Sequence, residues 1–333
     1  MQIHLDHPYV PFAIETVRQA VFLARDIQTE LVSTSLSKED KSPVTVTDFA
    51  VQALISCLLE RAFPKSALVA EEDSSILRRP ESEAVLRKVV RFVGRYAAYA
   101  TPETVCAWLD RGGGEPKGGF WVLDPIDGTK GFLRGGHFAI ALAYVEDGNV
   151  QLGVLGCPKL SADGKNAVSG EGAIAAAVRG AGAWISPLSD SSARSALRVS
   201  SCSVEREARV LRSVESSHTN EEKFEELLRA LDVTLPPICM DSQSKYVVLA
   251  SGHAELLFRL PSRQQPNYRE CIWDQAAGAL VVEEAGGRIT DLYGRPLDFS
   301  AGRRLNNNVG ILASNGILHE RALAVVQRIY GNA

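Results

Sequence analysis

One short segment constrains the fold of this 333-residue chain more than any other. Phe120–Leu123 is an apolar run that indicates a buried strand, and it leads directly into the sequence Asp-Pro-Ile-Asp-Gly-Thr at 124–129. The proline stiffens a turn after the strand, and Gly128 permits a close approach to the backbone. Because unpaired carboxylates are costly to bury, the two aspartates after this strand favour a functional role, with Asp124, Asp127 and the Ile126 carbonyl converging on one ion.

The composition limits what such a site can bind. The chain is 45% hydrophobic and 23% charged, as is usual for a globular protein of this size. Its formal net charge of −4 provides no basic field for nucleic acid, so an anionic ligand must be captured by local cations or by metal ions. Residues Met1–Val10 do not resemble a secretory signal, and no apolar stretch is long enough to cross a bilayer. We therefore expect a cytoplasmic monomer with no nucleic-acid or membrane partner.

Hydrophobic spacing predicts a first domain of α+β type over residues 1–190. A helix is predicted for Tyr9–Leu31, a short strand for Pro43–Thr47, and a second helix from Asp48, with this residue at its N-terminal edge. The glycine-rich run Arg111–Gly119 lacks the lysine and hydroxyl of a P-loop, so it is interpreted as a mobile connection. Two hairpins are predicted next, His137–Val145 with Val150–Cys157 and Gly172–Val178 with Ala183–Ile185.

A serine- and alanine-rich stretch, Pro187–Ser203, marks the expected boundary to a second domain over residues 196–333. Strands and helices alternate there, which favours an α/β arrangement. The predicted strands are Val210–Val214, Ala254–Leu260 and Val309–Ala313. The predicted helices are Asn220–Leu231, with Thr219 as a cap, then Asp241–Ala250, Asp274–Ala285 and a terminal helix from Gly316.

Acidic residues stand at the ends of these elements rather than on charged helix faces. They are Asp48, Glu71, Asp124 with Asp127, and Asp274. Each has an ordinary structural explanation when taken alone, as a solvated loop, a helix cap or an Asx turn. Together they match the preference of hard divalent cations for oxygen ligands, with magnesium held by a few carboxylates and a substrate phosphate.

The same blocks resemble the superfamily of inositol monophosphatase and fructose-1,6-bisphosphatase. The matching segments are Asp48 after Pro-Val-Thr-Val-Thr, Glu71-Glu72, Trp121–Thr129, and Trp273-Asp274-x-Ala-Ala-Gly. Within it the chain looks most like the 3′(2′),5′-bisphosphate nucleotidases, which convert 3′-phosphoadenosine 5′-phosphate to AMP. That closer resemblance is carried by Gly131–Gly135, Glu215–His218, Asp241–Tyr246 and Arg259–Pro261.

The resemblance implies a layered αβαβα sandwich and a magnesium-dependent, lithium-sensitive phosphomonoesterase with two or three ions. It implies metal ligands at Glu71, Asp124, the Ile126 carbonyl, Asp127 and Asp274. Asp48 and Thr129 would position and deprotonate the attacking water. The nucleotide would be held by Thr129, His218, Ser242, Lys245, Arg259 and Asp274.

The residues also leave alternatives open. The same chemistry on an inositol mono- or bisphosphate would not need the set formed by His218, Lys245 and Arg259. Without the neighbouring motifs, Lys245 and Arg259 are ordinary surface or helix-end cations. A catalytically silent protein that senses nucleotides or metal ions is disfavoured, because the carboxylate set and Thr129 are all present.

Overall fold

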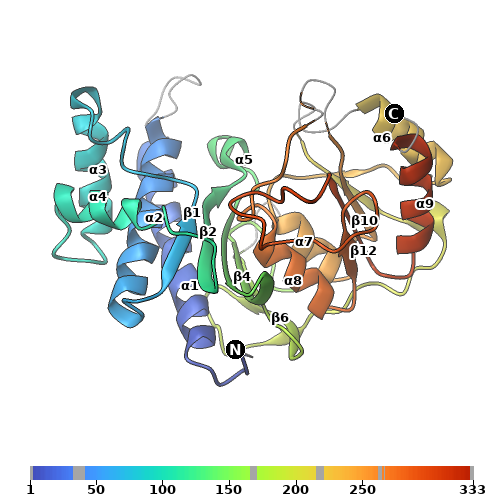
Figure 1. Ribbon diagram of the computed structural model, residues 1–333, viewed down its shortest axis with the longest axis horizontal. Helices are drawn as coiled ribbons and strands as arrows, with labels where there is room; N and C mark the ends of the chain where they lie inside the picture. Colours follow the sequence, from blue (N-terminus) through green and yellow to red (C-terminus); the bar gives the residue numbers. More distant parts are fainter. Residues whose placement is uncertain are drawn as a thin grey trace.

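The computed structural model describes residues 3–32, 42–165, 171–214, 221–261, 265 and 267–330. These residues form alternating layers of helices and sheets, which Figure 1 shows in order across the page. A helical layer with α1 and α2 is followed by a seven-stranded sheet, the pair α7 and α8, a five-stranded sheet, and α6 with α9. None of the helices in the described part of the chain combines the length and apolar character needed to span a bilayer.

The first helical layer begins with α1 (Tyr9–Ile27), which continues into a π-helical turn, Gln28–Val32. The long helix predicted here is therefore confirmed. Two shorter helices, α3 (Glu83–Val93) and α4 (Pro102–Asp110), pack against α2 on its outer side. The sequence did not predict either of them.

The strand predicted for Pro43–Thr47 is wrong, because these residues belong to α2 (Ser42–Ala62). Every residue of α2 from Val46 to Cys57 is buried, so this helix is enclosed on all sides. Such a segment has no amphipathic stripe, and a short Val-Thr alternation cannot be told from a strand by periodicity alone. Tertiary packing on both sides therefore decides in favour of helix. As a result Asp48 lies inside α2 rather than at its edge.

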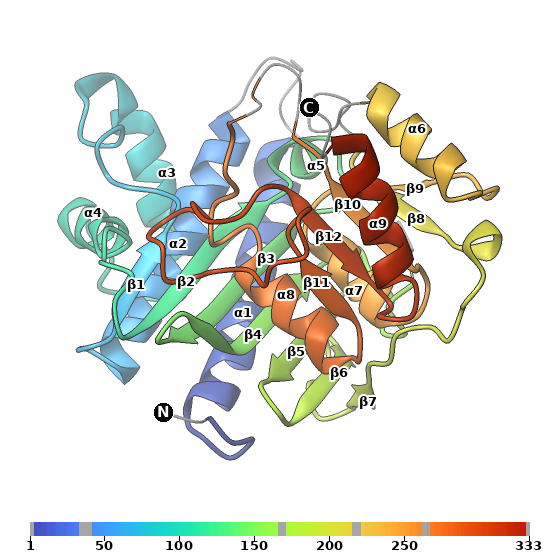
Figure 2. The same ribbon diagram turned by 45° about the vertical axis from the view of Figure 1, so that its right-hand side comes forward.

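The seven-stranded sheet has its strands in sequence order, and Figure 2 shows them side by side. The first pair is parallel and the remaining pairs are antiparallel. Both predicted hairpins are confirmed, as is the buried strand before the aspartates. The strands are β1 (Ala67–Ala70), β2 (Gly119–Asp127), β3 (Ala139–Glu146), β4 (Asn149–Cys157), β5 (Ala173–Val178), β6 (Gly182–Pro187) and β7 (Ser195–Ala196).

The Arg111–Gly119 connection is attached to the free edge of β1. The N–H of Ala70 donates to the Gly112 carbonyl, and the N–H of Gly114 donates to the Leu68 carbonyl, both at 2.9 Å. The first half of this glycine-rich run is thus held against the strand that ends beside Glu71.

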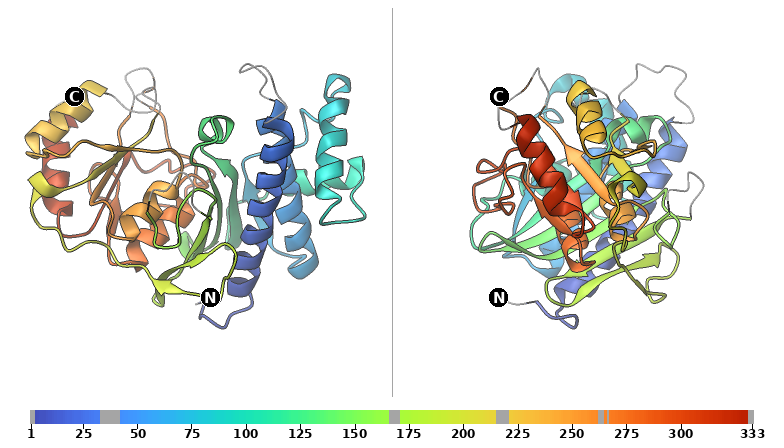
Figure 3. Two further views of the ribbon diagram at one scale, coloured as in Figure 1. Left: turned by 180° about the vertical axis from the view of Figure 1, so that it is seen from behind. Right: turned by 90° about the vertical axis from the view of Figure 1, so that its right-hand side faces the viewer.

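The second half of the chain alternates strands and helices as predicted, with boundaries shifted by a few residues. Its sheet has the order β11 (Arg288–Thr290), β12 (Ile311–Ser314), β10 (Leu256–Arg259), β8 (Val210–Arg212) and β9 (Ile238–Cys239). Its helices are α6 (Glu221–Ala230), α7 (Ser244–Ala250), α8 (Ala276–Glu284) and α9 (His319–Tyr330). Figure 3 shows α6 and α9 on the outer face of this sheet. The predicted cap Thr219 lies outside the described residues.

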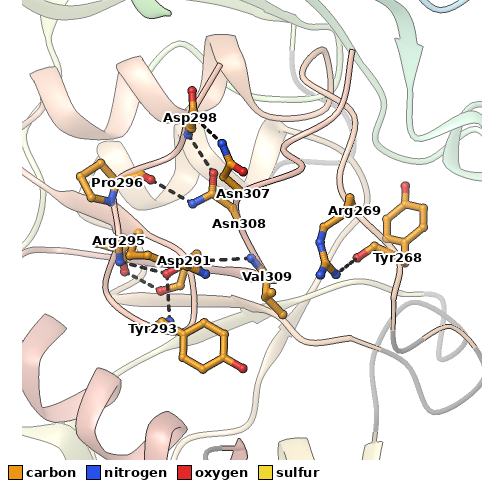
Figure 4. A network of polar contacts seen from close by, with 11 residues as sticks. Tyr268, Arg269, Asp291, Tyr293, Arg295, Pro296, Asp298, Asn307, Asn308 and Val309 are labelled. Carbon is orange, nitrogen blue, oxygen red and sulfur yellow. Dashed lines mark hydrogen bonds and ion pairs between the residues drawn. The ribbon is translucent and has the colours of Figure 1, made fainter. Parts of the chain in front are cut away.

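A long loop between β11 and β12 has its own network of polar contacts, drawn in Figure 4. The fully buried carboxylate of Asp291 accepts hydrogen bonds from the N–H groups of Tyr293 and Arg295, each at 2.9 Å. The Asn308 amide donates to the Pro296 carbonyl, and its oxygen accepts from the N–H of Asp298. These side chains form hydrogen bonds with backbone groups that are not paired in a β-sheet, and they thereby fix the conformation of the loop.

Candidate active site

A cleft of about 300 Å³ lies between the two halves of the molecule. Its lining contains every predicted site residue except Asp48 and His218. The latter lies outside the described residues. The short helix α5 (Thr129–Leu133) borders the cleft, and the predicted residues that line it are Glu71, Asp124, Ile126, Asp127, Thr129, Ser242, Lys245, Arg259 and Asp274.

Strand register places the first two carboxylates side by side. Strands β1 and β2 are parallel, and Ala70 pairs with Leu123. Glu71, which directly follows β1, and Asp124, within β2, are the next residues along the two segments, so they occupy neighbouring positions at the same end of the paired strands. The adjacency of these carboxylates follows from backbone pairing between segments more than fifty residues apart.

A bulge in β2 brings the second aspartate into the same site. On β3, Ala141 pairs with Asp124 and Ala139 pairs with Asp127, so β2 contains one residue more than its partner over this interval. Side chains alternate between faces along a regular strand, which would place residues three apart on opposite faces. The extra residue in β2 shifts this alternation by one, so Asp124 and Asp127 can face the same site. Gly128 then adopts a left-handed conformation, with φ of 86°, and α5 begins at the following residue.

Burial and mutual repulsion raise the pKa values of these acids. Burial, followed by the charge of Glu71, raises the pKa of Asp124 well above its usual range. Burial, followed by Glu72, raises the pKa of Glu71 to about 7. Burial likewise raises the pKa of Asp274 to about 8, although Arg259 opposes the shift. A cation among them would reverse this penalty by favouring the charged forms.

The chemistry of the cleft fits a divalent cation. Oδ1 of Asp124 is buried, and no hydrogen bond to it was found within the described residues. An anionic oxygen in that position is suited to a metal ion. Over the same residues, no three acidic, histidine or cysteine side chains converge into a complete ligand set.

Asp48 and Thr129, which are expected to position and deprotonate the attacking water, differ in how deeply they are buried. Thr129 is exposed to the cleft, and its hydroxyl donates to the Ile126 carbonyl at 3.3 Å. Asp48 is 5% exposed and does not line the cleft. Burial, followed by repulsion from Glu72 and Glu71, raises the pKa of Asp48 well above its usual range. Asp48 is therefore an inner neighbour of the carboxylates rather than part of the cleft wall.

Cationic residues face the carboxylates from the second half of the chain. Lys245 is 3% exposed, and its ammonium donates to the Met240 carbonyl at 3.2 Å. Burial lowers its pKa to about 8, while the charge of Asp127 opposes that shift. The same Asp127 accepts a hydrogen bond at 2.6 Å from the N–H of Gln243, which joins the two halves at the site. Ser242, in the left-handed region with φ of 69°, precedes it.

Several residues of this wall were not predicted from the sequence. Glu270 forms an ion pair with Arg259, with Nη2 and Oε2 2.7 Å apart. Arg134 forms another with Asp241, also from Nη2, at 2.6 Å. Tyr268 and Ser213 line the cleft as well. Both ion pairs join segments that touch only after folding. The one signal for them was that Arg134 and Asp241 lie inside the blocks that carry the nucleotidase resemblance.

Comparison with known proteins agrees with this geometry. The model of the inositol monophosphatase family matches residues 6–330, so the chain belongs to that family. Members of the family are metal-dependent phosphatases. The fold of an inositol monophosphatase from Zymomonas mobilis superimposes with a TM-score of 0.62 at 21% identity, covering 95% of this chain and 97% of that one. The expected layered fold is thereby confirmed.

Two curated relatives are considerably more similar in sequence. A protein named 3′(2′),5′-bisphosphate nucleotidase from Oryza sativa is 40% identical over 336 residues, covering 95% of this chain and 92% of the relative. One with the same name from Emericella nidulans is 36% identical over 340 residues, covering 94% and 96% respectively. The chain therefore spans nearly the whole length of both relatives.

Proposed function

We propose that this protein is a 3′(2′),5′-bisphosphate nucleotidase that hydrolyses the 3′-phosphate of 3′-phosphoadenosine 5′-phosphate (PAP) to leave AMP, and that also accepts the sulfated form. One observation carries the proposal. A single cleft has metal-binding carboxylates on one wall and the buried ammonium of Lys245 with the guanidinium of Arg259 on the other. A substrate with two phosphates can present one to each wall. The relatives from Oryza sativa and Emericella nidulans support the choice of nucleotide.

The metal is proposed to be magnesium, as two or three ions. The residues that would hold it are Glu71, Asp124, the Ile126 carbonyl, Asp127 and Asp274. When bound, the ions would neutralise charge on the phosphoryl oxygens, activate a water and stabilise the leaving oxygen. Lithium is close to magnesium in size but has half the charge, so we expect it to inhibit.

Water activation is assigned to Thr129 and Asp48. The Thr129 hydroxyl donates to the Ile126 carbonyl, which leaves its lone pairs to accept a hydrogen bond from a water in the cleft. Asp48 is buried beside Glu71 and Glu72, and bound cations would favour its charged form, which can accept a proton. In this arrangement Thr129 orients the water and Asp48 acts as the inner proton acceptor.

Substrate binding is assigned to the second wall. Lys245 and Arg259 would hold the phosphate that is not hydrolysed, with Ser242, Asp274 and Thr129 contacting the rest of the nucleotide. The role proposed for His218 concerns a residue outside the described part of the chain. We also propose that the protein acts as a monomer.

The test is phosphate release in the presence of magnesium from a matched panel of substrates. The panel contains PAP, its sulfated form, AMP, inositol 1-phosphate, inositol 1,4-bisphosphate and fructose 1,6-bisphosphate. We expect the highest kcat/KM for PAP. Faster hydrolysis of an inositol phosphate would instead support the alternative activity. Tight nucleotide binding without phosphate release from any substrate would identify a silent binding protein.

A further inference from the structure

We propose that Arg303 is a positioning residue that holds in place Glu71, from the first half of the chain, and Asp274, from the second half, where both line the cleft. It lies in the long loop between β11 and β12 and does not line the cleft itself. Its side chain contacts the residue immediately before Glu71 and the residue immediately before Asp274. This inference rests on the proposed metal site, to which both carboxylates are assigned.

The first contact fixes the end of β1. Nη2 of Arg303 donates to the Ala70 carbonyl, and Nη1 donates to the Gly112 carbonyl at 3.0 Å. The Ala70 carbonyl belongs to the peptide group that joins it to Glu71. Rotation of that peptide would turn the Glu71 side chain away from Asp124. The guanidinium therefore restrains the orientation of Glu71 and ties the Arg111–Gly119 connection to the same point.

The second contact fixes the turn that carries Asp274. The guanidinium carbon of Arg303 lies 4.9 Å from the centre of the Trp273 ring, a cation–π arrangement. The main-chain carbonyl of Arg303 also accepts a hydrogen bond from the N–H of Ile272 at 3.1 Å. The Trp273 carbonyl in turn accepts from the Gln243 amide at 3.0 Å, and the Gln243 N–H donates to Asp127.

The backbone of Arg303 is itself well supported. The next residue, Arg304, forms an isolated antiparallel bridge with Cys271. The N–H of Leu305 donates to the Glu270 carbonyl at 2.9 Å. Together with the Asp291 network in Figure 4, these contacts restrain the backbone of the loop that carries the Arg303 side chain. Because its own backbone is restrained, the Arg303 side chain can restrict the movement of Glu71 and Asp274 through its contacts with the residues that precede them.

Only arginine can make all of these contacts at once. Its planar guanidinium donates in two directions and stacks on an aromatic ring, whereas a lysine ammonium is a point charge on a flexible stem. Outer groups that orient metal ligands typically contribute 10- to 100-fold in metal affinity. Loss of Arg303 is therefore expected to weaken cation binding without removing a ligand.

The experiment measures Mn²⁺ binding to the substrate-free protein from the EPR signal of free Mn²⁺. The variants are Arg303→Met, which keeps an apolar stem, and Arg303→Lys. The matched control is Arg111→Met, because Nη2 of Arg111 donates to the Ser66 carbonyl at 3.1 Å, at the opposite end of β1. We expect about a tenfold weaker Kd for Arg303→Met, a smaller loss for Arg303→Lys, and less than a twofold change for the control.

Thermal unfolding of all variants without metal separates positioning from folding. A folded Arg303→Met protein with the wild-type Kd for Mn²⁺ would overturn the inference, and so would an equal loss of affinity in Arg111→Met. If Arg303→Met does not fold, the Kd of Arg303→Lys decides in the same way. Absence of Mn²⁺ binding to the wild type would instead contradict the proposed metal site, and with it this inference.

Discussion

Glu270 pairs with Arg259 on the substrate wall, with Oε2 and Nη2 2.7 Å apart. Gln275 also donates to the same Oε2 at 3.1 Å, so the glutamate is held in place. Part of the Arg259 charge is therefore already balanced within the protein. Lys245 donates its hydrogen bond to a neutral carbonyl, that of Met240, although the charges of Asp127 and Asp241 also act on it. A second phosphate is consequently expected to gain more from the lysine than from the arginine.

The first prediction follows from this difference. Lys245→Ala should lower kcat/KM for PAP by about ten- to a hundredfold, which corresponds to one charge-assisted hydrogen bond of roughly 1.5–3 kcal/mol. Arg259→Ala should cause a smaller loss, because Glu270 shares its charge. Both losses should be much smaller for 3′-AMP, which lacks the 5′-phosphate. Equal fractional losses on the two substrates would mean that these cations support the fold or the metal site.

The second prediction concerns metal binding by Asp127. Asp127→Asn should lower kcat by roughly a hundredfold or more, because it removes one negative charge from the cation site. The new amide oxygen can still accept from the Gln243 N–H, so the fold should be kept. Circular dichroism provides that control. Chelation should abolish wild-type activity and magnesium should restore it, and full activity in excess EDTA would refute the mechanism.

The third prediction distinguishes a hydroxyl that orients water from one that only stabilises the turn before α5 through its hydrogen bond to the Ile126 carbonyl. Thr129→Ala should lower kcat on the order of 10²–10⁴-fold while the melting temperature changes little. Thr129→Ser retains the hydroxyl that reaches the Ile126 carbonyl and should recover most of the activity. If the alanine variant kept the wild-type kcat, Thr129 would be only a structural residue.

The fourth prediction concerns acid stability and a histidine far from the cleft. His319 is fully buried, with Nδ1 2.8 Å from the Ser314 hydroxyl and Nε2 3.0 Å from that of Thr290. Burial lowers its pKa from 6.5 to about 4. Below pH 6.5 the unfolded chain binds a proton that the folded chain does not. The stability from neutral His319 is therefore complete above pH 6.5 and is lost as the pH falls toward 4.

Urea unfolding at pH 7.5 and pH 5 measures this effect. His319 alone should account for a decrease of about 2 kcal/mol in the free energy of unfolding at pH 5. His319→Gln should be less stable at pH 7.5, since it disturbs buried hydrogen bonds, but its stability should fall less between the two pH values. An identical pH dependence for wild type and variant would show that other groups carry the acid sensitivity.

Local sequence was sufficient wherever short-range physics decided the structure. The apolar run before Asp124 became β2, and the two turn-flanked runs after it became hairpins, because their periodicity and turn residues agree with their burial. The prediction from local sequence was wrong at Pro43–Thr47. The helix there is buried on every side, so its hydrophobic residues do not show the helical spacing of a half-exposed helix. The division into domains 1–190 and 196–333 stays a prediction.

The sequence by itself determined the identity and order of the carboxylates, the strand that leads to Asp124, and the resemblance that implies metal-dependent phosphatase chemistry. Only the tertiary structure decided which of these residues meet. The register of β1 on β2 placed Glu71 beside Asp124, and the bulge brought Asp127 to the same cleft. Arg303 reaches Ala70 across more than two hundred residues. Such long-range pairings depend on backbone geometry and mutual burial, for which a linear pattern carries no signal.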